Sequence, residues 1–191
     1  MKRLLIVIDY QNDFVDGSLG FPGAELLEGP IAAKIAEYRE AGDDIVFTLD
    51  VHDKNYLQTE EGKHLPVEHC LEGTPGMELY GSIASLLETS DPVIEKAAFG
   101  SKDLFDRLCG FQRIADNLGK QPFKSIELVG LVLNICVLSE AVLVKTACPN
   151  VPIIIDATCT DTFDKDMREK AFDVLEGLHI TIENREQTTQ E

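Results

Sequence analysis

Six short apolar runs, separated by segments with helical periodicity, restrict the fold of this chain more than any other feature. The runs are LLIVID (4–9), DIVFTL (44–49), PVIEK (92–96), SIELVG (125–130), PIIID (152–156) and HITIE (179–183). Several are continuous runs of Val, Ile and Leu, which is typical of strands buried on both faces of a sheet. Strands that alternate with helices predict a three-layer α/β/α fold with a six-stranded, mainly parallel sheet.

The segments between the runs carry apolar residues at helical spacing. These residues are Ile31, Ile35 and Tyr38 in one segment, and Phe163, Met167, Ala171 and Leu175 in another. Pro30 suits the first position of the earlier helix, and segment 135–147 is apolar nearly all round, which predicts a buried helix. We find no internal repeat, so a single domain over residues 1–191 is expected.

Composition narrows the partners and the location that we expect. The chain has 34 acidic and 17 basic residues, a formal net charge of −17, which argues against a nucleic-acid partner. No apolar run reaches membrane-spanning length and no signal-peptide pattern is present, so we expect a cytoplasmic protein without a membrane partner. Five cysteines without a CxxC pair indicate reduced thiols, not a disulfide framework.

Polar residues stand at the ends of four predicted strands. Asp9 and Lys96 end the first and third runs, Asp50 directly follows the second, and the stretch GLVLN leads from the fourth run to Cys136. Because the carboxyl ends of parallel strands meet at one edge of a sheet, we expect these four side chains to form a site there. The long irregular region 50–78 is of a length usually found in functional or disordered loops.

Cys136 is the candidate nucleophile at this edge. Lys96 would favour its thiolate, Asp9 could take its proton, and the start of a helix would offer free backbone N–H groups. Each residue also has a plainer interpretation, as a packed thiol, a turn-capping carboxylate and a surface ammonium group. Their joint occurrence at three strand ends favours the catalytic interpretation.

Asp50, His52 and His69 have the side chains of a divalent metal site. Residues two apart in an extended chain point the same way, so Asp50 and His52 can bind the same metal ion. His69 would reach that ion from the long loop. The alternative is that His52, His64 and His69 are ordinary loop histidines, which the residues alone favour.

Six motifs, in this order, carry a resemblance to a known family. They are IDYQNDF, DVH, LPVEHCLEGTPG, EKAAFGS, GLVLNICVL and DATCT. In order and spacing they resemble the isochorismatase-like cysteine hydrolases, and among these the nicotinamidase-type amidases, over about residues 4–183. The resemblance implies an Asp9–Lys96–Cys136 triad. It also implies an oxyanion hole formed by the backbone N–H groups of Val132 and Cys136, with a cis peptide bond between Leu131 and Val132.

The resemblance also implies one divalent metal ion. Its ligands would be Asp50, His52 and His69, with Glu61 the best match for an additional glutamate and Glu60 and His64 as competitors. Zinc is the expected ion, and manganese and iron are alternatives. In nicotinamidases such a metal holds the pyridine nitrogen of the substrate, so the three ligands favour a nicotinamidase-like function.

The expected activity is therefore hydrolysis of a linear amide C–N bond, with nicotinamide converted to nicotinate and ammonia in NAD salvage. Ureido or carbamoyl amides, isochorismate, and a non-catalytic binding role on the same fold are the alternatives. Leu133-Asn134, where the family often has Thr-Asp, leaves the substrate open. Phe14 and Phe99 are candidate walls for a flat ring, with Tyr56 ranked below them, although aromatic residues beside a site are as often core packing.

The expected partners are a small amide substrate and further copies of the chain in a homo-oligomer. Segment 104–124 has apolar positions at Leu104, Phe105, Leu108, Phe111 and Ile114. These could form part of an interface between copies, but the favoured interpretation is that they cover the sheet.

Overall fold

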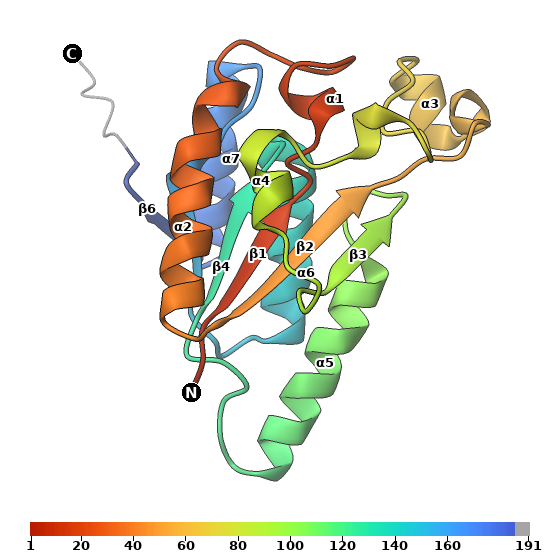
Figure 1. The fold of residues 1–191 in the computed structure, drawn as a ribbon. Helices are drawn as coiled ribbons and strands as arrows, with labels where there is room; N and C mark the ends of the chain where they lie inside the picture. The colour runs from red at the N-terminus through yellow and green to blue at the C-terminus, as the bar shows by residue number, and fades with distance from the viewer. Residues whose placement is uncertain (186–191) are drawn as a thin grey trace.

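The computed structural model describes residues 1–185, and a six-stranded sheet forms its centre (Figure 1). The strands are β1 (Leu4–Ile8), β2 (Asp44–Asp50), β3 (Val93–Lys96), β4 (Ile126–Gly130), β5 (Ile153–Thr160) and β6 (Thr181–Glu183). Their order is β3-β2-β1-β4-β5-β6, and every pairing between them is parallel. The predicted α/β class and the six strands are thus confirmed, and the strand order reverses between β1 and β4.

Helices cover both faces of the sheet and make three layers (Figure 1). One face carries α1 (Asn12–Val15), α2 (Glu28–Glu40) and α4 (Gly81–Leu86), and the other carries α5 (Lys102–Asn117), α6 (Leu138–Ala147) and α7 (Lys165–Gly177). Successive residues of β1 point to opposite faces, so Leu5 and Val7 enter one apolar core and Ile6 and Ile8 the other. Short helices break the long region after β2, namely η2 (Tyr56–Gln58), α3 (Glu60–His64) and η3 (Pro75–Met77), and η1 (Ala24–Leu27) precedes α2.

Two helices differ at their first turns from the sequence prediction. Helix α2 begins at Glu28, so Pro30 is its third residue, where a missing backbone N–H is harmless because the first turn has no acceptor for it. Helix α7 begins at Lys165, because the Asp164 side chain caps the N–H groups that follow it. Phe163 therefore lies outside α7 and is 65% exposed, so its predicted place on the buried stripe is wrong.

The predicted buried helix 135–147 consists of two parts. A π-helical turn, η4 (Leu133–Val137), contains Cys136, and α6 follows it from Leu138. Val142 is 39% exposed, so α6 is not buried all round as predicted. The π-helical turn thus stands between the carboxyl end of β4 and the start of α6.

Helix α5 covers the sheet only along its first half. Leu104 and Leu108 are buried, whereas Phe111 is 53% and Ile114 60% exposed. The favoured interpretation, that the apolar face of this segment covers the sheet, is therefore wrong for Phe111 and Ile114. Within residues 1–185, no helix is both long enough and apolar enough to cross a membrane.

Candidate active site

The four predicted strand-end residues meet at the carboxyl edge of the sheet. Asp9 follows β1, Asp50 ends β2, Lys96 ends β3, and Cys136 lies in η4 beyond β4. Lys96 Nζ lies 2.6 Å from Asp9 Oδ2, 3.7 Å from Cys136 Sγ and 3.8 Å from Asp50 Oδ1. The cluster stands where the strand order reverses, which is where ligands bind in folds of this kind.

Contacts with β2 fix the orientation of Asp9. Its backbone has a positive φ of 46° and turns sharply out of β1. Thr48 donates from Oγ1 to Asp9 Oδ1 at 2.7 Å, and the Asp9 N–H donates to the Thr48 carbonyl at 3.2 Å. The remaining carboxylate oxygen, Oδ2, therefore faces Lys96.

Close contact between β4 and β1 brings the Cys136 turn over Asp9. Gly130 ends β4 with a φ of 114°, and a Cβ there would lie 1.9 Å from the Ile8 carbonyl oxygen. Only glycine permits this approach, and the next N–H, of Leu131, donates to the same carbonyl at 2.9 Å. The two central strands thus end in contact, and the chain turns directly into η4.

The backbone before Cys136 has the arrangement that the resemblance implies. The Leu131–Val132 peptide is cis, and the Val132 N–H has no hydrogen-bond acceptor among residues 1–185. The Val132 carbonyl accepts hydrogen bonds from the N–H groups of Ile135 and Val137 and so holds the turn. The Val132 N–H is thus available to an oxygen of a bound molecule, and its role in an oxyanion hole stays a prediction.

Burial and neighbouring charges together set the pKa values of Asp9, Lys96 and Cys136. Burial raises the pKa of Asp9, the Lys96 charge opposes this, and Asp50 adds to it. Burial alone would lower the pKa of Lys96, but the charges of Asp9 and Cys136 raise it above its ordinary value. Burial and the Asp9 carboxylate raise the pKa of the Cys136 thiol, and Lys96 lowers it. Lys96 and Asp9 thus lie at ion-pair distance, 2.6 Å, beside a thiol whose pKa is raised.

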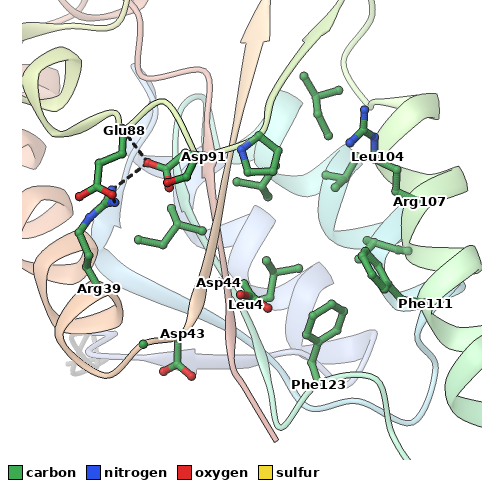
Figure 2. Close-up of a pocket in the computed structure, with 17 residues that line it drawn as sticks. Leu4, Arg39, Asp43, Asp44, Glu88, Asp91, Leu104, Arg107, Phe111 and Phe123 are labelled. Atoms are coloured by element: carbon green, nitrogen blue, oxygen red, sulfur yellow. Dashed lines mark hydrogen bonds and ion pairs between the residues drawn. The ribbon is translucent and has the colours of Figure 1, made fainter. Parts of the chain in front are cut away.

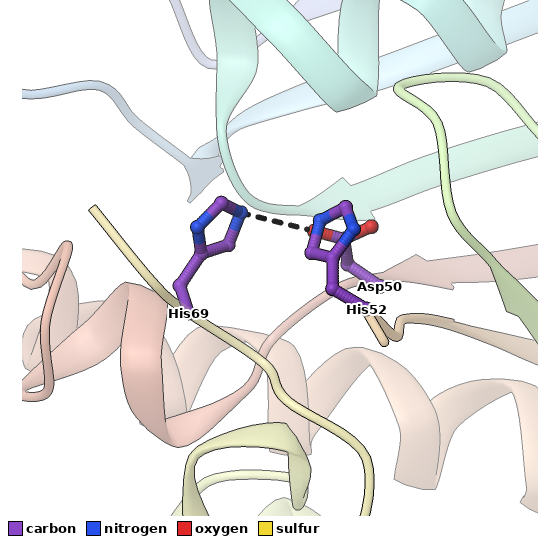
Figure 3. A group of neighbouring side chains, drawn as sticks. All are labelled: Asp50, His52 and His69. Atoms are coloured by element: carbon purple, nitrogen blue, oxygen red, sulfur yellow. Dashed lines mark hydrogen bonds and ion pairs between the residues drawn. The ribbon is translucent and has the colours of Figure 1, made fainter. Parts of the chain in front are cut away.

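Three buried side chains of metal-ligating type, Asp50, His52 and His69, lie together (Figure 3). Asp50 places this group next to Lys96, at 3.8 Å. His52 Nε2 is 2.9 Å and His69 Nε2 3.4 Å from Asp50 Oδ2, and the candidate ligand atoms all lie within 4.8 Å of one another. His69 Nδ1 lies 2.8 Å from the Val67 carbonyl, and this contact fixes the ring with Nε2 toward Asp50. The donor types and their spacing fit a divalent cation.

Glu61 adjoins this cluster, and the two competing residues do not. Glu61 Oε1 lies 3.9 Å from His52 Nε2 and 3.7 Å from His69 Nε2. Glu60 and His64 instead contact each other at 3.4 Å, with side chains 77% and 80% exposed. The structure thus brings Glu61 to the candidate metal centre and leaves Glu60 and His64 on the surface.

Two polar side chains that the sequence prediction missed hold this centre in place. Gln11 is fully buried; its Nε2 donates to the Asp50 carbonyl and its Oε1 accepts from the Asp50 N–H, both at 2.8 Å. Asp13 Oδ2 accepts from the Cys70 N–H at 2.7 Å and so fixes the loop beside His69. Both belong to the IDYQNDF motif, and their place in that motif was the available signal.

Aromatic rings line the histidine side of the cluster. The Phe14 ring centre lies 5.5 Å from that of His69 and is buried. Tyr56, ranked below Phe14 in the sequence analysis, is closer, at 4.6 Å from the His52 ring and 4.8 Å from the His69 ring. Phe99 follows Lys96 by three residues and is 45% exposed, so it is free to contact a ligand.

The unusual Leu133-Asn134 pair is accommodated by packing and one hydrogen bond. Leu133 is fully buried in the core. Asn134 Oδ1 accepts a hydrogen bond from Thr162 Oγ1 at 2.6 Å, which ties the Cys136 turn to the segment after β5. This bond supports the turn without involving the thiol.

A thiol, a carboxylate and an ammonium group lie together at the carboxyl edge of a parallel sheet, next to a candidate metal centre, which is an arrangement suited to hydrolytic chemistry on an α/β fold. The isochorismatase domain matches residues 3–187, and the chain belongs to the isochorismatase family. Within that family it is a hydrolase of the nicotinamidase/pyrazinamidase-like kind.

Individual relatives support this assignment. The isochorismatase family protein PncA of Bacillus subtilis is 32% identical over 146 residues, which cover 74% of this chain and 78% of that protein. The nicotinamidase/pyrazinamidase of Mycobacterium tuberculosis is 28% identical over 73% of this chain and 76% of its own. The crystal structure of nicotinamidase PncA from Bacillus subtilis superposes with a TM-score of 0.80 at 27% identity, over 96% of this chain and 100% of that one.

A more distant structure shares the fold. Pyrazinamidase of Pyrococcus horikoshii in complex with zinc superposes with a TM-score of 0.77 at 23% identity, over 95% of this chain and 98% of that one.

Proposed function

We propose that this chain hydrolyses nicotinamide to nicotinate and ammonia through a thioester on Cys136. The observation that carries the proposal is the contact between two groups of side chains. The candidate metal cluster of Asp50, His52 and His69 adjoins the Asp9–Lys96–Cys136 triad, with Lys96 Nζ 3.8 Å from Asp50 Oδ1. A ring nitrogen held at the first group would place a carboxamide near the second, and relatives that are nicotinamidases support this substrate.

In the first half of the reaction Asp9 takes the proton of the Cys136 thiol. Its raised pKa makes it a stronger base than an exposed carboxylate, and Lys96 stabilises the thiolate that forms at 3.7 Å. The thiolate sulfur attacks the amide carbon, and the N–H groups of Val132 and Cys136 would stabilise the oxyanion. Asp9 then returns the proton to the amide nitrogen, the C–N bond breaks, and ammonia leaves.

In the second half a water molecule hydrolyses the thioester. Asp9, again ionised, takes a proton from the water as its oxygen attacks the acyl carbon. The C–S bond breaks, the sulfur recovers its proton from Asp9, and nicotinate is released. One carboxylate thus serves both halves because Lys96 holds it beside the sulfur.

We also propose that a zinc ion, or in its place manganese or iron, binds Asp50, His52 and His69, with Glu61 as an additional or water-mediated ligand. When bound, the ion would supply a Lewis-acid position that orients the ring nitrogen of the substrate. The single experiment that tests the activity is incubation of the metal-loaded protein with nicotinamide, with ammonia measured enzymatically. Ammonia release proportional to enzyme is expected, and its absence despite stoichiometric metal would contradict the substrate assignment.

Three alternatives predict other outcomes. A ureido or carbamoyl amidase would release ammonia from those compounds and not from nicotinamide. An isochorismate hydrolase would release no ammonia from nicotinamide and would not require the metal, so hydrolysis of isochorismate at equal rates before and after chelation would favour it. A non-catalytic binding protein would leave Cys136 unreactive, and rapid alkylation of Cys136 by iodoacetamide at neutral pH would exclude that role.

For the oligomeric state we propose a two-fold dimer through α5. A groove of about 530 Å³ separates α5 from the amino ends of β1, β2 and β3, at the edge of the sheet opposite the active site (Figure 2). Its floor is apolar, with Leu4, Val46 and Phe123 among its residues. Beside the groove, α5 exposes an apolar ridge formed by Phe111, Ile114 and Leu118, the last residue following the helix.

Basic side chains, unpaired within the described part of the chain, lie on α5 and in the segment that follows it. Segment 107–124 carries Arg107, Arg113, Lys120 and Lys124 but one acidic residue, in a chain of net charge −17. Among residues 1–185 none of these four basic side chains forms an ion pair within 4.0 Å. The groove also holds Asp43, Asp44, Glu88 and Asp91, which pair with Lys2, Arg3 and Arg39 of the same chain (Figure 2). An exposed apolar ridge beside a groove suits an interface between identical copies.

Sedimentation velocity tests this interface. The wild type is expected to sediment as a dimer and Ile114→Glu as a monomer. Val174→Glu, at a residue 52% exposed on α7, serves as the matched control and should stay dimeric. A monomeric wild type, or a dimer that Ile114→Glu leaves intact, would refute the proposed surface.

A further inference from the structure

Glu140 is a fully buried acidic residue that the proposed reaction does not use. It lies in the first turn of α6, four residues after Cys136, and residues at this spacing lie on the same side of a helix. Its Oε1 accepts the backbone N–H of Ser101 at 2.6 Å. Ser101 caps the start of α5, where its Oγ accepts from the Leu104 N–H at 3.1 Å. Glu140 therefore joins the helix of the nucleophile to the start of α5.

The segment between β3 and α5 carries the contact that fixes Lys96. Lys96 Nζ donates to the Ala98 carbonyl at 3.0 Å, and the same ammonium group lies 3.7 Å from Cys136 Sγ. The segment packs tightly on α6, because a Cβ on Gly100 would lie 2.6 Å from Leu143 Cδ1. A closed ring of contacts thus runs from Cys136 along α6 to Glu140, through Ser101 to Ala98, and back to the sulfur through Lys96.

The environment of Glu140 is unfavourable for a residue with a purely structural role. Within residues 1–185, its buried Oε2 has no hydrogen-bond partner. Burial raises the pKa of Glu140 to about 7, while the Ser101 N–H and the Lys96 charge oppose the shift. An apolar side chain would avoid the free-energy cost of a buried carboxyl group with one oxygen unpaired. Among the described residues, the one hydrogen bond that the carboxyl group accepts comes from the Ser101 N–H. Because Ser101 belongs to the segment that contacts Lys96, this hydrogen bond can fix the position of Lys96.

We propose that Glu140 is a positioning residue: it anchors the segment 97–101 so that the Ala98 carbonyl holds the Lys96 ammonium group against the Cys136 thiol. The inference rests on the proposed role of Cys136 as the nucleophile. The properties of Glu140 that matter for this role are the length of its side chain and an oxygen that accepts the Ser101 N–H.

Two substitutions separate reach from charge. Glu140→Gln keeps the length and an acceptor oxygen for the Ser101 N–H, whereas Glu140→Asp keeps the charge but is one methylene shorter. With nicotinamide as substrate, the Asp variant is expected to lose about tenfold or more in kcat with KM within about threefold, because the lysine is misplaced and the ring site is not. The Gln variant should stay within about threefold of the wild type in both constants.

The rate of Cys136 alkylation by iodoacetamide provides a readout that does not depend on the substrate. It should fall in the Asp variant and be retained in the Gln variant. Glu127→Gln is the control. Glu127 is a buried glutamate that contacts Tyr38 and Lys34, remote from the site, so its substitution should change thermal stability but leave the rate of Cys136 alkylation unchanged. Thermal unfolding of each variant identifies any that do not fold.

The outcomes distinguish this inference from the proposed function. If the Asp variant is active and the Gln variant impaired, the charge is what matters and the positioning role is refuted. Equal effects of the two substitutions, on turnover and alkylation alike, would also refute it. If the wild type releases no ammonia, the substrate assignment fails, and the alkylation series still decides the role of Glu140.

Discussion

Replacement of Lys96 by Met removes an ammonium group 3.7 Å from Cys136 Sγ and 2.6 Å from Asp9 Oδ2 while keeping a side chain of similar length. At an effective dielectric constant of about 20, a unit charge at 3.7 Å stabilises a thiolate by about 4 kcal/mol. This corresponds to about 3 pKa units, since one unit is worth about 1.4 kcal/mol. Asp9 also loses its partner and protonates more readily, which weakens its repulsion of the thiolate. We therefore expect the thiol pKa to rise by about 2 units.

The assay is the alkylation rate of Cys136 by iodoacetamide, followed by mass spectrometry of the peptide that contains it. Because a cation favours the thiolate, its removal should lower the rate at pH 7 by about 100-fold, and the rate should recover as the pH rises. Lys34→Met removes another largely buried ammonium group, paired with Glu127 and Asp156, and should leave the rate unchanged. A Lys96→Met rate within about threefold of the wild type would refute the electrostatic role assigned to Lys96.

Three further outcomes follow from contacts around the site. Asp13→Ala removes the acceptor of the Cys70 N–H and so frees the loop that carries His69. At limiting metal, elemental analysis should then show about tenfold or more less zinc per chain, and an unchanged zinc content would contradict the anchoring role of Asp13. Gly130→Ala places a Cβ 1.9 Å from the Ile8 carbonyl oxygen, and urea titration should show a loss of about 4 kcal/mol or more in unfolding free energy. The pKa of Glu140 is about 7 when folded, against 4.5 ordinarily, so the wild type loses stability as the pH rises through this window. Glu140→Gln escapes that loss, and its advantage in unfolding free energy should grow by up to about 3 kcal/mol between pH 4.5 and pH 8; a constant difference would show that the folded pKa is ordinary.

The sequence was sufficient to predict which strand ends meet. Asp9, Asp50 and Lys96 each end or directly follow an apolar run, and parallel strands place their carboxyl ends on one edge whatever the loops do. The same reasoning located Cys136, because the GLVLN stretch begins at the end of β4. These predictions depend on the period and direction of strands, which a single sequence records well.

The contacts that support the site could not be predicted in this way. Gln11 binds the backbone of Asp50, Asp13 binds that of Cys70, and Glu140 binds that of Ser101, across 39, 57 and 39 residues respectively. Each contact depends on the path of a loop, and a loop path leaves no periodic signal. An acidic residue in the first turn of a mostly apolar helix was the local sign of Glu140.

Apolar residues near the ends of helices were also predicted incorrectly from their spacing. Phe163 has the spacing of the α7 stripe but lies before the cap formed by Asp164, so the helix starts too late to bury it. On α5, Phe111 and Ile114 have the character of core residues, yet the helix extends past the edge of the sheet, where no strand covers them (Figure 1). In both cases tertiary packing, not periodicity, decides which apolar residues are buried.

Ammonia release from nicotinamide by the wild type and by Cys136→Ala, at equal metal content, tests the central claim most directly. Turnover by the wild type and a background rate for the alanine variant are expected, with the fold of the variant retained in thermal unfolding, because the substitution removes only one buried sulfur atom from the core. Ammonia release by Cys136→Ala at a rate close to that of the wild type would contradict the assignment of Cys136 as the nucleophile.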